Sequence, residues 1–171
     1  MRLLDEIKKD FITTKQHFGA SFWQVLRLAG VKILISYRIR SAAKRHKIPL
    51  INAILAATER TVWGIELSVD AQIGSVIILH PVAIVIGKST IGDGCIFCGS
   101  NTIGGRYKHT TGENMGNPQI GRNVEFGAGA RILGAISIGD NVKIGANAVV
   151  IRNIPAGAIA IGVPATYIKR K

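Results

Sequence analysis

The chain is poor in cysteine, in acidic residues and in long apolar runs. Its only two cysteines lie three positions apart, so a secreted fold held together by disulfides is excluded, and a reducing, cytoplasmic compartment is the simpler expectation. The most apolar segment, residues 22–37, is interrupted by Arg27 and Lys32, and residues 1–15 hold charges but no uninterrupted apolar stretch. We therefore expect neither a membrane span nor a signal peptide.

Aromatic residues are also scarce, at 6% of 171 residues, whereas hydrophobic residues of all kinds reach 47% and glycine contributes 20 residues. A chain of this length can bury a core as a single domain. That core must be built from aliphatic side chains, and the backbone must turn often.

The charge is strongly basic and unevenly distributed. The formal net charge is +12, with 12 basic and 4 acidic side chains in residues 1–60 and 10 basic and 6 acidic ones in residues 61–171. Such an excess favours an anionic partner, either a membrane surface, a nucleic acid or a phosphorylated substrate, without choosing among them.

An aliphatic residue or phenylalanine recurs at every sixth position in two runs. These residues are Ile73, Leu79, Val85, Ile91, Phe97 and Ile103, and then Ile120, Phe126, Ile132, Ile138, Ile144 and Val150. Two positions earlier the residue is usually small or aliphatic, as expected when alternate residues of a short strand point inward. The period predicts a mainly β fold, a solenoid of short parallel strands and corners that is stabilised by the stacking of its coils.

Glycine directly follows many of the recurring residues, at Gly74, Gly92, Gly104, Gly121, Gly127, Gly139 and Gly145. We expect these glycines to lie at corners that need a positive φ angle.

Both ends of the repeat region carry candidate caps. Apolar residues at helical spacing predict helices over 22–40 and 48–62, within a basic N-terminal segment at 1–62. At the other end Pro155 and Pro164 are expected to end the repeats and to leave residues 155–171 as a tail.

The repeats are interrupted between the two runs. Residues 105–119 are too polar and too rich in glycine to form a coil, so they should protrude from the solenoid domain, residues 63–171, as a loop.

Several motifs resemble the hexapeptide-repeat acyltransferases, which fold as left-handed parallel β-helices. They are IGKSTIGDG, the longer run IGRNVEFGAGARILGAISIGDNVKIGANAVV, and the ending GVPA. Within that family the chain is most similar to the branch that contains serine acetyltransferases and the acetyltransferases of colanic acid and capsular polysaccharide. The resemblance implies a homotrimer that binds acetyl-CoA in grooves between neighbouring β-helices.

The same resemblance assigns a catalytic base to His80, in the segment ILHPVAIVIG. An imidazole there could take a proton from an acceptor hydroxyl, because its ordinary pKa of about 6.5 lies near working pH. A carboxylate that orients the imidazole would assist it; Glu66 is the candidate, with Asp70 as a competitor. A solvated histidine at a corner and a solvated glutamate are the alternatives.

Other positions match the family's oxyanion and cofactor sites. The consecutive Gly104 and Gly105 can present backbone N–H groups to an oxyanion, or they simply begin the loop. For acetyl-CoA, the resemblance points to small residues beside the pantetheine arm and to cations for its phosphates; they are Ala128, Ala146, Lys143, Lys169 and Arg170.

Two metal or redox interpretations are set aside. Cys95 and Cys98 form a C-x-x-C pattern without the second pair that a zinc site needs. The β-helix of carbonic anhydrases uses three histidines, but only His80 and His109 lie in the repeat region. We expect no metal.

The prediction of the acceptor depends on two positions at which this sequence differs from serine acetyltransferases. Leu79 stands where they have an aspartate before the catalytic histidine, and Asn117 stands where they have a second histidine. The loop's NMGNP instead resembles polysaccharide acetyltransferases, so we expect a sugar hydroxyl, with Asn117 and His109 contacting the acceptor.

Three further interpretations accompany this prediction. A lipid-linked sugar would explain basic helices in contact with an anionic membrane surface. O-acetylation of serine is the alternative reaction. A non-enzymatic β-helix scaffold or basic binding protein is the third reading, and we expect no nucleic-acid partner.

Overall fold

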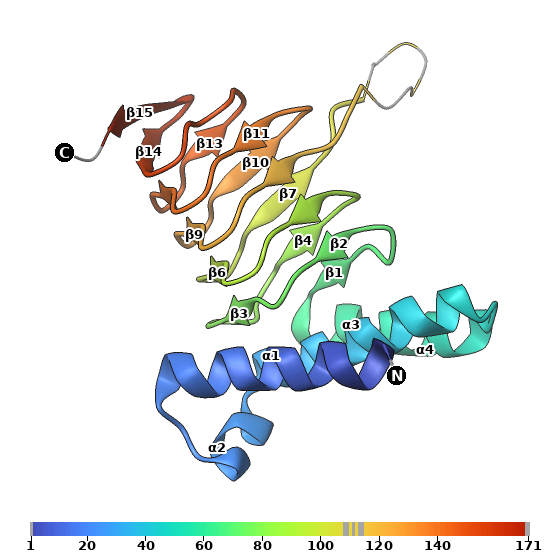
Figure 1. The fold of residues 1–171 in the computed structure, drawn as a ribbon. Helices are drawn as coiled ribbons and strands as arrows, with labels where there is room; N and C mark the ends of the chain where they lie inside the picture. The colour runs from blue at the N-terminus through green and yellow to red at the C-terminus, as the bar shows by residue number, and fades with distance from the viewer. Residues whose placement is uncertain (1, 108–109, 111, 113–114, 170–171) are drawn as a thin grey trace.

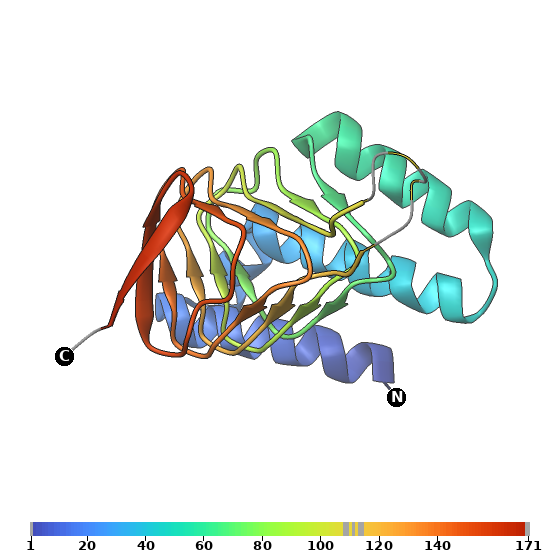
Figure 2. The same cartoon turned by 90° about the horizontal axis from the view of Figure 1, so that it is seen from above.

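The computed structural model describes residues 2–107, 110, 112 and 115–169. Helices at the N-terminus lie across one end of a stack of β-coils, and the chain runs from this end to the far end of the stack (Figures 1 and 2). None of the helices in the described part of the chain is long and apolar enough to cross a membrane.

Three parallel sheets form the walls of the stack. Sheet A contains β1 (Glu66–Leu67), β4 (Val85–Ile86), β7 (Thr102–Gly104), β10 (Arg131–Leu133) and β13 (Val149–Val150). Sheet B contains β2 (Gln72–Ile73), β5 (Thr90–Ile91), β8 (Gln119–Ile120) and β11 (Ser137–Ile138). Sheet C contains β3 (Ile77–Ile78), β6 (Ile96–Phe97), β9 (Glu125–Phe126), β12 (Lys143–Ile144), β14 (Ala158–Gly162) and the antiparallel β15 (Ala165–Lys169).

The chain passes through sheets A, B and C in turn, and the corners between them form three edges, called here the A–B, B–C and C–A edges. Identical positions of successive coils stack in register, so one inward residue from each strand joins a buried ladder. In sheet C two members of the ladder, Phe97 and Phe126, stack with ring centroids 4.7 Å apart. The core is therefore a column of aliphatic side chains with one aromatic pair.

The period fails in the first two coils. Leu79 and Val85 were expected to point inward, but Ile78 and Ile86 occupy those places, and Val85 is 40% exposed. The spacing of inward residues is five from Ile73 to Ile78 rather than six. Because side chains alternate along a strand, a slip of one residue reverses the face on which each lies.

The glycines after the inward residues have a different role from the expected one. Without a left-handed φ angle, they allow the coils to stack closely: a Cβ atom on Gly92 would lie 2.6 Å from the Gly121 carbonyl oxygen, and one on Gly127 would lie 2.5 Å from the Ala146 nitrogen. Gly104 is the exception, with no atom within 4 Å. In five of these corners the left-handed residue comes two positions later, at Gly94, Asn123, Gly129, Asn141 and Asn147.

The helical segment is more broken than the sequence predicted. It contains α1 (Arg2–Phe18), α2 (Phe22–Arg27), α3 (Ala29–Arg45), α4 (Pro49–Thr58) and the π-helical turn η1 (Glu59–Trp63). The expected helix over 22–40 breaks at Leu28, whose ψ of 127° is extended, and α1 was not predicted. The helix expected over 48–62 ends in η1, which Gly64 stops at a left-handed φ of 62°.

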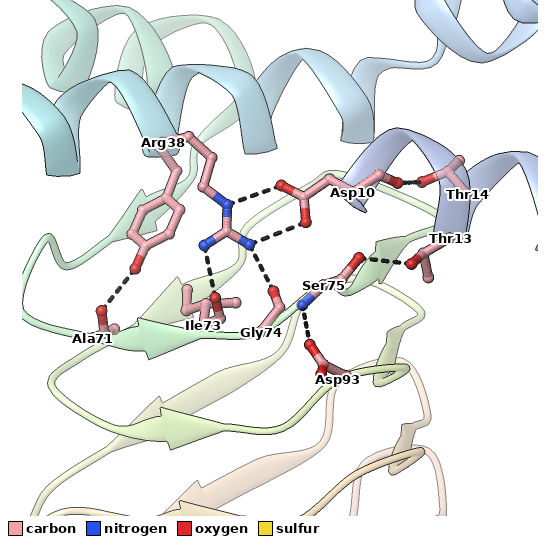
Figure 3. Close-up of polar contacts among 10 residues, drawn as sticks. Asp10, Thr13, Thr14, Arg38, Ala71, Ile73, Gly74, Ser75 and Asp93 are labelled. Atoms are coloured by element: carbon pink, nitrogen blue, oxygen red, sulfur yellow. Dashed lines mark hydrogen bonds and ion pairs between the residues drawn. The ribbon is translucent and has the colours of Figure 1, made fainter. Parts of the chain in front are cut away.

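Side chains of α1 and α3 form hydrogen bonds and an ion pair at the edge of the first coil (Figure 3). The Arg38 guanidinium donates to the carbonyl oxygens of Ile73 and Gly74 at 2.7 Å each, and it forms a buried ion pair with Asp10. The Tyr37 hydroxyl donates to the Ala71 carbonyl at 2.7 Å. Helix side chains thus pair edge groups that would otherwise have no partner.

Helix α3 also approaches sheet C closely at one point. A Cβ atom on Gly30 would lie 2.3 Å from the Ile78 carbonyl oxygen, so only glycine fits between the helix and strand β3. Ile78 lies two residues before His80, and this contact therefore supports the corner that carries the candidate base.

The C-terminal segment continues the stack instead of ending it. Strand β14 pairs in parallel with β12, with Ile144 opposite Ala160, and β15 folds back on β14 as an antiparallel hairpin. The expectation that Pro155 ends the repeats and begins a tail is therefore wrong, because Ala158 and Ala160 are buried core residues of a further coil.

Candidate active site

His80 lies on the C–A edge, at the corner between β3 and β4. Its side chain is exposed, and its carbonyl oxygen accepts a hydrogen bond from the Val82 N–H at 2.8 Å. Gly99 lies directly beneath it in the next coil, where a Cβ atom would be 2.5 Å from the His80 carbonyl oxygen, and Gly99 has a φ of 108°. The sequence interpretation missed Gly99; its signal was the glycine in IFCGS that does not follow a recurring residue.

Two small residues of the predicted cofactor site lie on the same edge. Backbone hydrogen bonds join the corners of successive coils, from Gly129 to the Gly99 carbonyl at 3.0 Å and from Asn147 to the Ala128 carbonyl at 2.8 Å. Ala128 and Ala146 are exposed there. The C–A edge therefore presents a histidine at one level and small side chains at two later levels.

Glu66 lies on β1, the first strand of sheet A. It pairs with Val85, and its N–H donates to the Ile84 carbonyl at 2.8 Å. The side chain is exposed on the sheet that follows the His80 corner, although no hydrogen bond joins it to His80 in the described structure. Catalytic hydrogen bonds often form only when substrate is bound, so the geometry leaves Glu66 available as the orienting carboxylate.

The competitor Asp70 lies on a different edge. It belongs to the A–B corner of the first coil and forms an ion pair with Lys44 of α3. This carboxylate joins the helical segment to the stack, which removes the argument for pairing it with His80.

Gly104 and Gly105 also lie on the A–B edge, across sheet A from His80. Strands β4 and β7 are parallel and pair Val85 with Thr102. His80 precedes β4, whereas Gly104 ends β7. Within one chain the candidate base and the candidate oxyanion donors therefore lie at opposite ends of the strands of sheet A.

The protruding loop begins at Gly105, and its base is held by backbone pairing. The Arg106 N–H donates to the Gly116 carbonyl at 3.1 Å, and the Met115 N–H donates to the Arg106 carbonyl at 2.7 Å. A cavity of about 460 Å³ lies beside this base; it is lined by Gly105, Arg106, Tyr107, Leu133, Gly134, Ile136 and Ile151. A second cavity, of about 780 Å³, lies between α3 and sheet B, and its lining does not include His80.

The remaining predicted residues are scattered. Asn117 is half-buried near the end of the loop, and His109 and Arg170 lie outside the described residues. Lys143, on sheet C, forms an ion pair with Glu125 at 2.8 Å. Lys169 ends β15, where only its backbone is described.

The two cysteines behave as packing residues. Burial raises the pKa of Cys95 to about 11, and its Sγ lies 3.3 Å from the Gly121 carbonyl oxygen. Burial also raises the pKa of Cys98. Over the described residues, no three histidine, cysteine, aspartate or glutamate side chains are grouped so that they could hold a metal ion.

Comparison with known proteins places the chain in a family. The model of the bacterial transferase hexapeptide (six repeats) matches residues 117–152. A serine acetyltransferase of Helicobacter pylori (strain J99) is 39% identical over 151 residues, which are 86% of each chain. The chain belongs to the hexapeptide-repeat acyltransferase family. The expected left-handed parallel β-helix with an N-terminal helical region is confirmed.

Other members of the hexapeptide-repeat acyltransferases are longer. A serine acetyltransferase of Synechococcus elongatus is 35% identical over 145 residues, or 82% of this chain and 57% of the relative. The structure of soybean serine acetyltransferase complexed with serine superposes with a TM-score of 0.84 at 27% identity, over 97% of this chain and 69% of that one.

These comparisons correct the predicted acceptor of this hexapeptide-repeat acyltransferase. The matching proteins are serine acetyltransferases, so acetylation of a sugar in polysaccharide synthesis is the wrong interpretation. The inference of contact with a membrane rested on a lipid-linked sugar and loses its basis.

Proposed function

We propose that the protein transfers the acetyl group of acetyl-CoA to the hydroxyl of L-serine. The observation that carries this proposal is the 39% identity to a serine acetyltransferase over 86% of both chains. The exposed His80 on an edge lined with small residues supplies a base and a surface for an extended thioester arm.

The candidate base and the candidate oxyanion donors, called here the two half-sites, lie on different edges, which favours an active site between chains. His80 lies on the C–A edge, and Gly104 and Gly105 lie on the A–B edge. If neighbouring chains of a homotrimer pack with these edges together, His80 of one chain faces the glycines of the next. The small exposed side chains of Ala128 and Ala146 leave room on the C–A edge for the pantetheine arm.

The chemistry then follows from the two half-sites. His80 takes the proton of the serine hydroxyl while its oxygen attacks the thioester carbonyl. The backbone N–H groups at Gly104 and Gly105 stabilise the oxyanion. As the carbon–sulfur bond breaks, the imidazolium of His80 returns the proton to the departing thiolate, giving O-acetylserine and free CoA. Glu66 orients the imidazole and stabilises its charged form.

The test measures release of free CoA from acetyl-CoA with L-serine, against a blank without acceptor. Wild-type protein should show serine-dependent release, and His80→Ala should lose about 100-fold or more of turnover while it keeps its oligomeric size and its binding of acetyl-CoA. His46→Ala removes an exposed imidazole from the end of α3 and should keep full activity. Absence of serine-dependent release by wild-type protein would reject the proposal.

A further inference from the structure

An amino-acid acceptor presents a carboxylate, and a site that selects such an acceptor needs a positive charge to receive it. The serine-specific pattern named above has its second histidine at a position that is Asn117 here, and its aspartate at Leu79. If the proposed function holds, another cation of this chain must bind the carboxylate.

Arg106 lies beside the two glycines at which the acceptor is proposed to react. It follows Gly104 by two residues, so their Cα atoms are at most about 7 Å apart. The hydrogen bonds to Gly116 and from Met115 hold its backbone across the base of the loop. Its side chain is exposed, and in the described part of the chain it is the charged residue among those lining the 460 Å³ cavity.

Among the other described cations of the stack, Lys88 and Arg152 are exposed on the same A–B edge but do not line the 460 Å³ cavity. Three more have partners or lie on another edge. Arg131, on the outer face of sheet A, donates to the Thr102 hydroxyl and to the Ser100 carbonyl. Lys143 is paired with Glu125. Arg122 lies on the B–C edge, away from both half-sites.

We propose that Arg106 binds the α-carboxylate of the acceptor and determines that the enzyme selects an amino acid. A guanidinium can donate two parallel hydrogen bonds to a carboxylate, which fixes both the position and the orientation of the acceptor. With the carboxylate held at the loop base, the acceptor hydroxyl lies near the N–H groups of Gly104 and Gly105, where the thioester carbonyl is proposed to bind. The apolar wall of Leu133, Ile136 and Ile151 keeps competing polar groups away from the pair.

The experiment compares L-serine with L-serinamide, in which a neutral amide of similar size replaces the carboxylate. Wild-type protein should prefer L-serine in kcat/KM, and Arg106→Gln should reduce that preference by about 10- to 100-fold, mainly through KM for the acceptor. KM for acetyl-CoA should not change. Comparing the serine-to-serinamide ratio of kcat/KM between wild-type protein and the variant cancels the different intrinsic reactivities of the two acceptors.

Two further variants sharpen the comparison. Arg106→Lys keeps the charge but not the planar fork, so it should retain an intermediate preference. Arg122→Gln removes an exposed arginine from another edge and should keep the wild-type ratio. If Arg106→Gln keeps the wild-type preference, this inference is wrong even though serine is the substrate. If wild-type protein does not acetylate L-serine at all, the proposed function fails, and the inference fails with it.

Discussion

Removing one partner of the buried ion pair between Asp10 and Arg38 should cost far more stability than removing one partner of the exposed pair beside it. The first pair joins α1 to α3, whose Arg38 also binds carbonyl groups of the first coil, and the second pair joins α1 to the second coil. In the first, both side chains are less than a tenth exposed, whereas Lys9 and Asp93 are 59% and 47% exposed. The Arg38 guanidinium cannot lose its proton in a protein, so Asp10→Asn leaves a buried charge without its counterion.

The magnitudes of the two losses differ clearly. Breaking one partner out of a buried pair costs about 3–5 kcal/mol, whereas Lys9→Gln should cost about 1 kcal/mol or less. For a chain of this length, one kcal/mol shifts Tm by about 2–4 °C, so Asp10→Asn should lower Tm by about 6–20 °C.

Thermal and urea unfolding, followed by circular dichroism, would measure both variants at the same protomer concentration, since association changes apparent stability. The comparison is internal, because the two variants remove contacts of adjacent residues on one helix. If Asp10→Asn were no less stable than Lys9→Gln, the conclusion that Arg38 depends on Asp10 for its burial would be refuted.

Two further predictions concern the C–A edge and the cysteines. Gly99→Ala should lower kcat at least tenfold, because the added Cβ would displace the His80 backbone and a φ of 108° is strained for alanine. Gly87→Ala is the matched control, since no atom lies nearer than 3.5 Å to the added Cβ. Equal activity of the two variants would contradict the close fit between Gly99 and His80. Native protein treated with iodoacetamide at pH 8 should be modified at Cys98 well before Cys95, because burial raises the pKa of Cys95 to about 11 and leaves about one thiolate in a thousand. Modification of Cys95 should accelerate as pH rises towards that value, and peptide mass spectrometry that found the two equally modified would show that Cys95 is accessible.

The repeat could be predicted from the sequence because inward residues in most coils are separated by six positions. The prediction failed at Leu79 and Val85, because the residue that points inward and the adjacent outward one are both aliphatic. A slip of one residue therefore leaves no trace in hydropathy. The glycines were located correctly but for the wrong reason, since close contact between coils depends on stacking that a single sequence does not display.

The position of some candidate site residues could likewise be predicted from the sequence, and that of others could not. The six-residue period is sufficient to bring Ala128 and Ala146 to one edge, because they are three repeats apart. That His80 shares this edge needs the register of the strands, since the period fails in the first coils and the loop intervenes. That Gly104 and Gly105 lie on another edge follows from the order of the sheets, which needs the register of the strands. The acceptor could not be inferred from the NMGNP motif, because the loop's sequence does not show which side chains reach the cavity beside its base.

The loop leaves the stack after β7 and returns at β8 without disturbing a strand pair on either side: Thr102 still faces Arg131, and Gln119 still faces Thr90. The scaffold and the loop are thus separable parts. A loop of different length or composition could be grafted between residues 105 and 118 while every coil kept its neighbours, so the choice of acceptor can diverge among descendants of such a chain at little cost to folding.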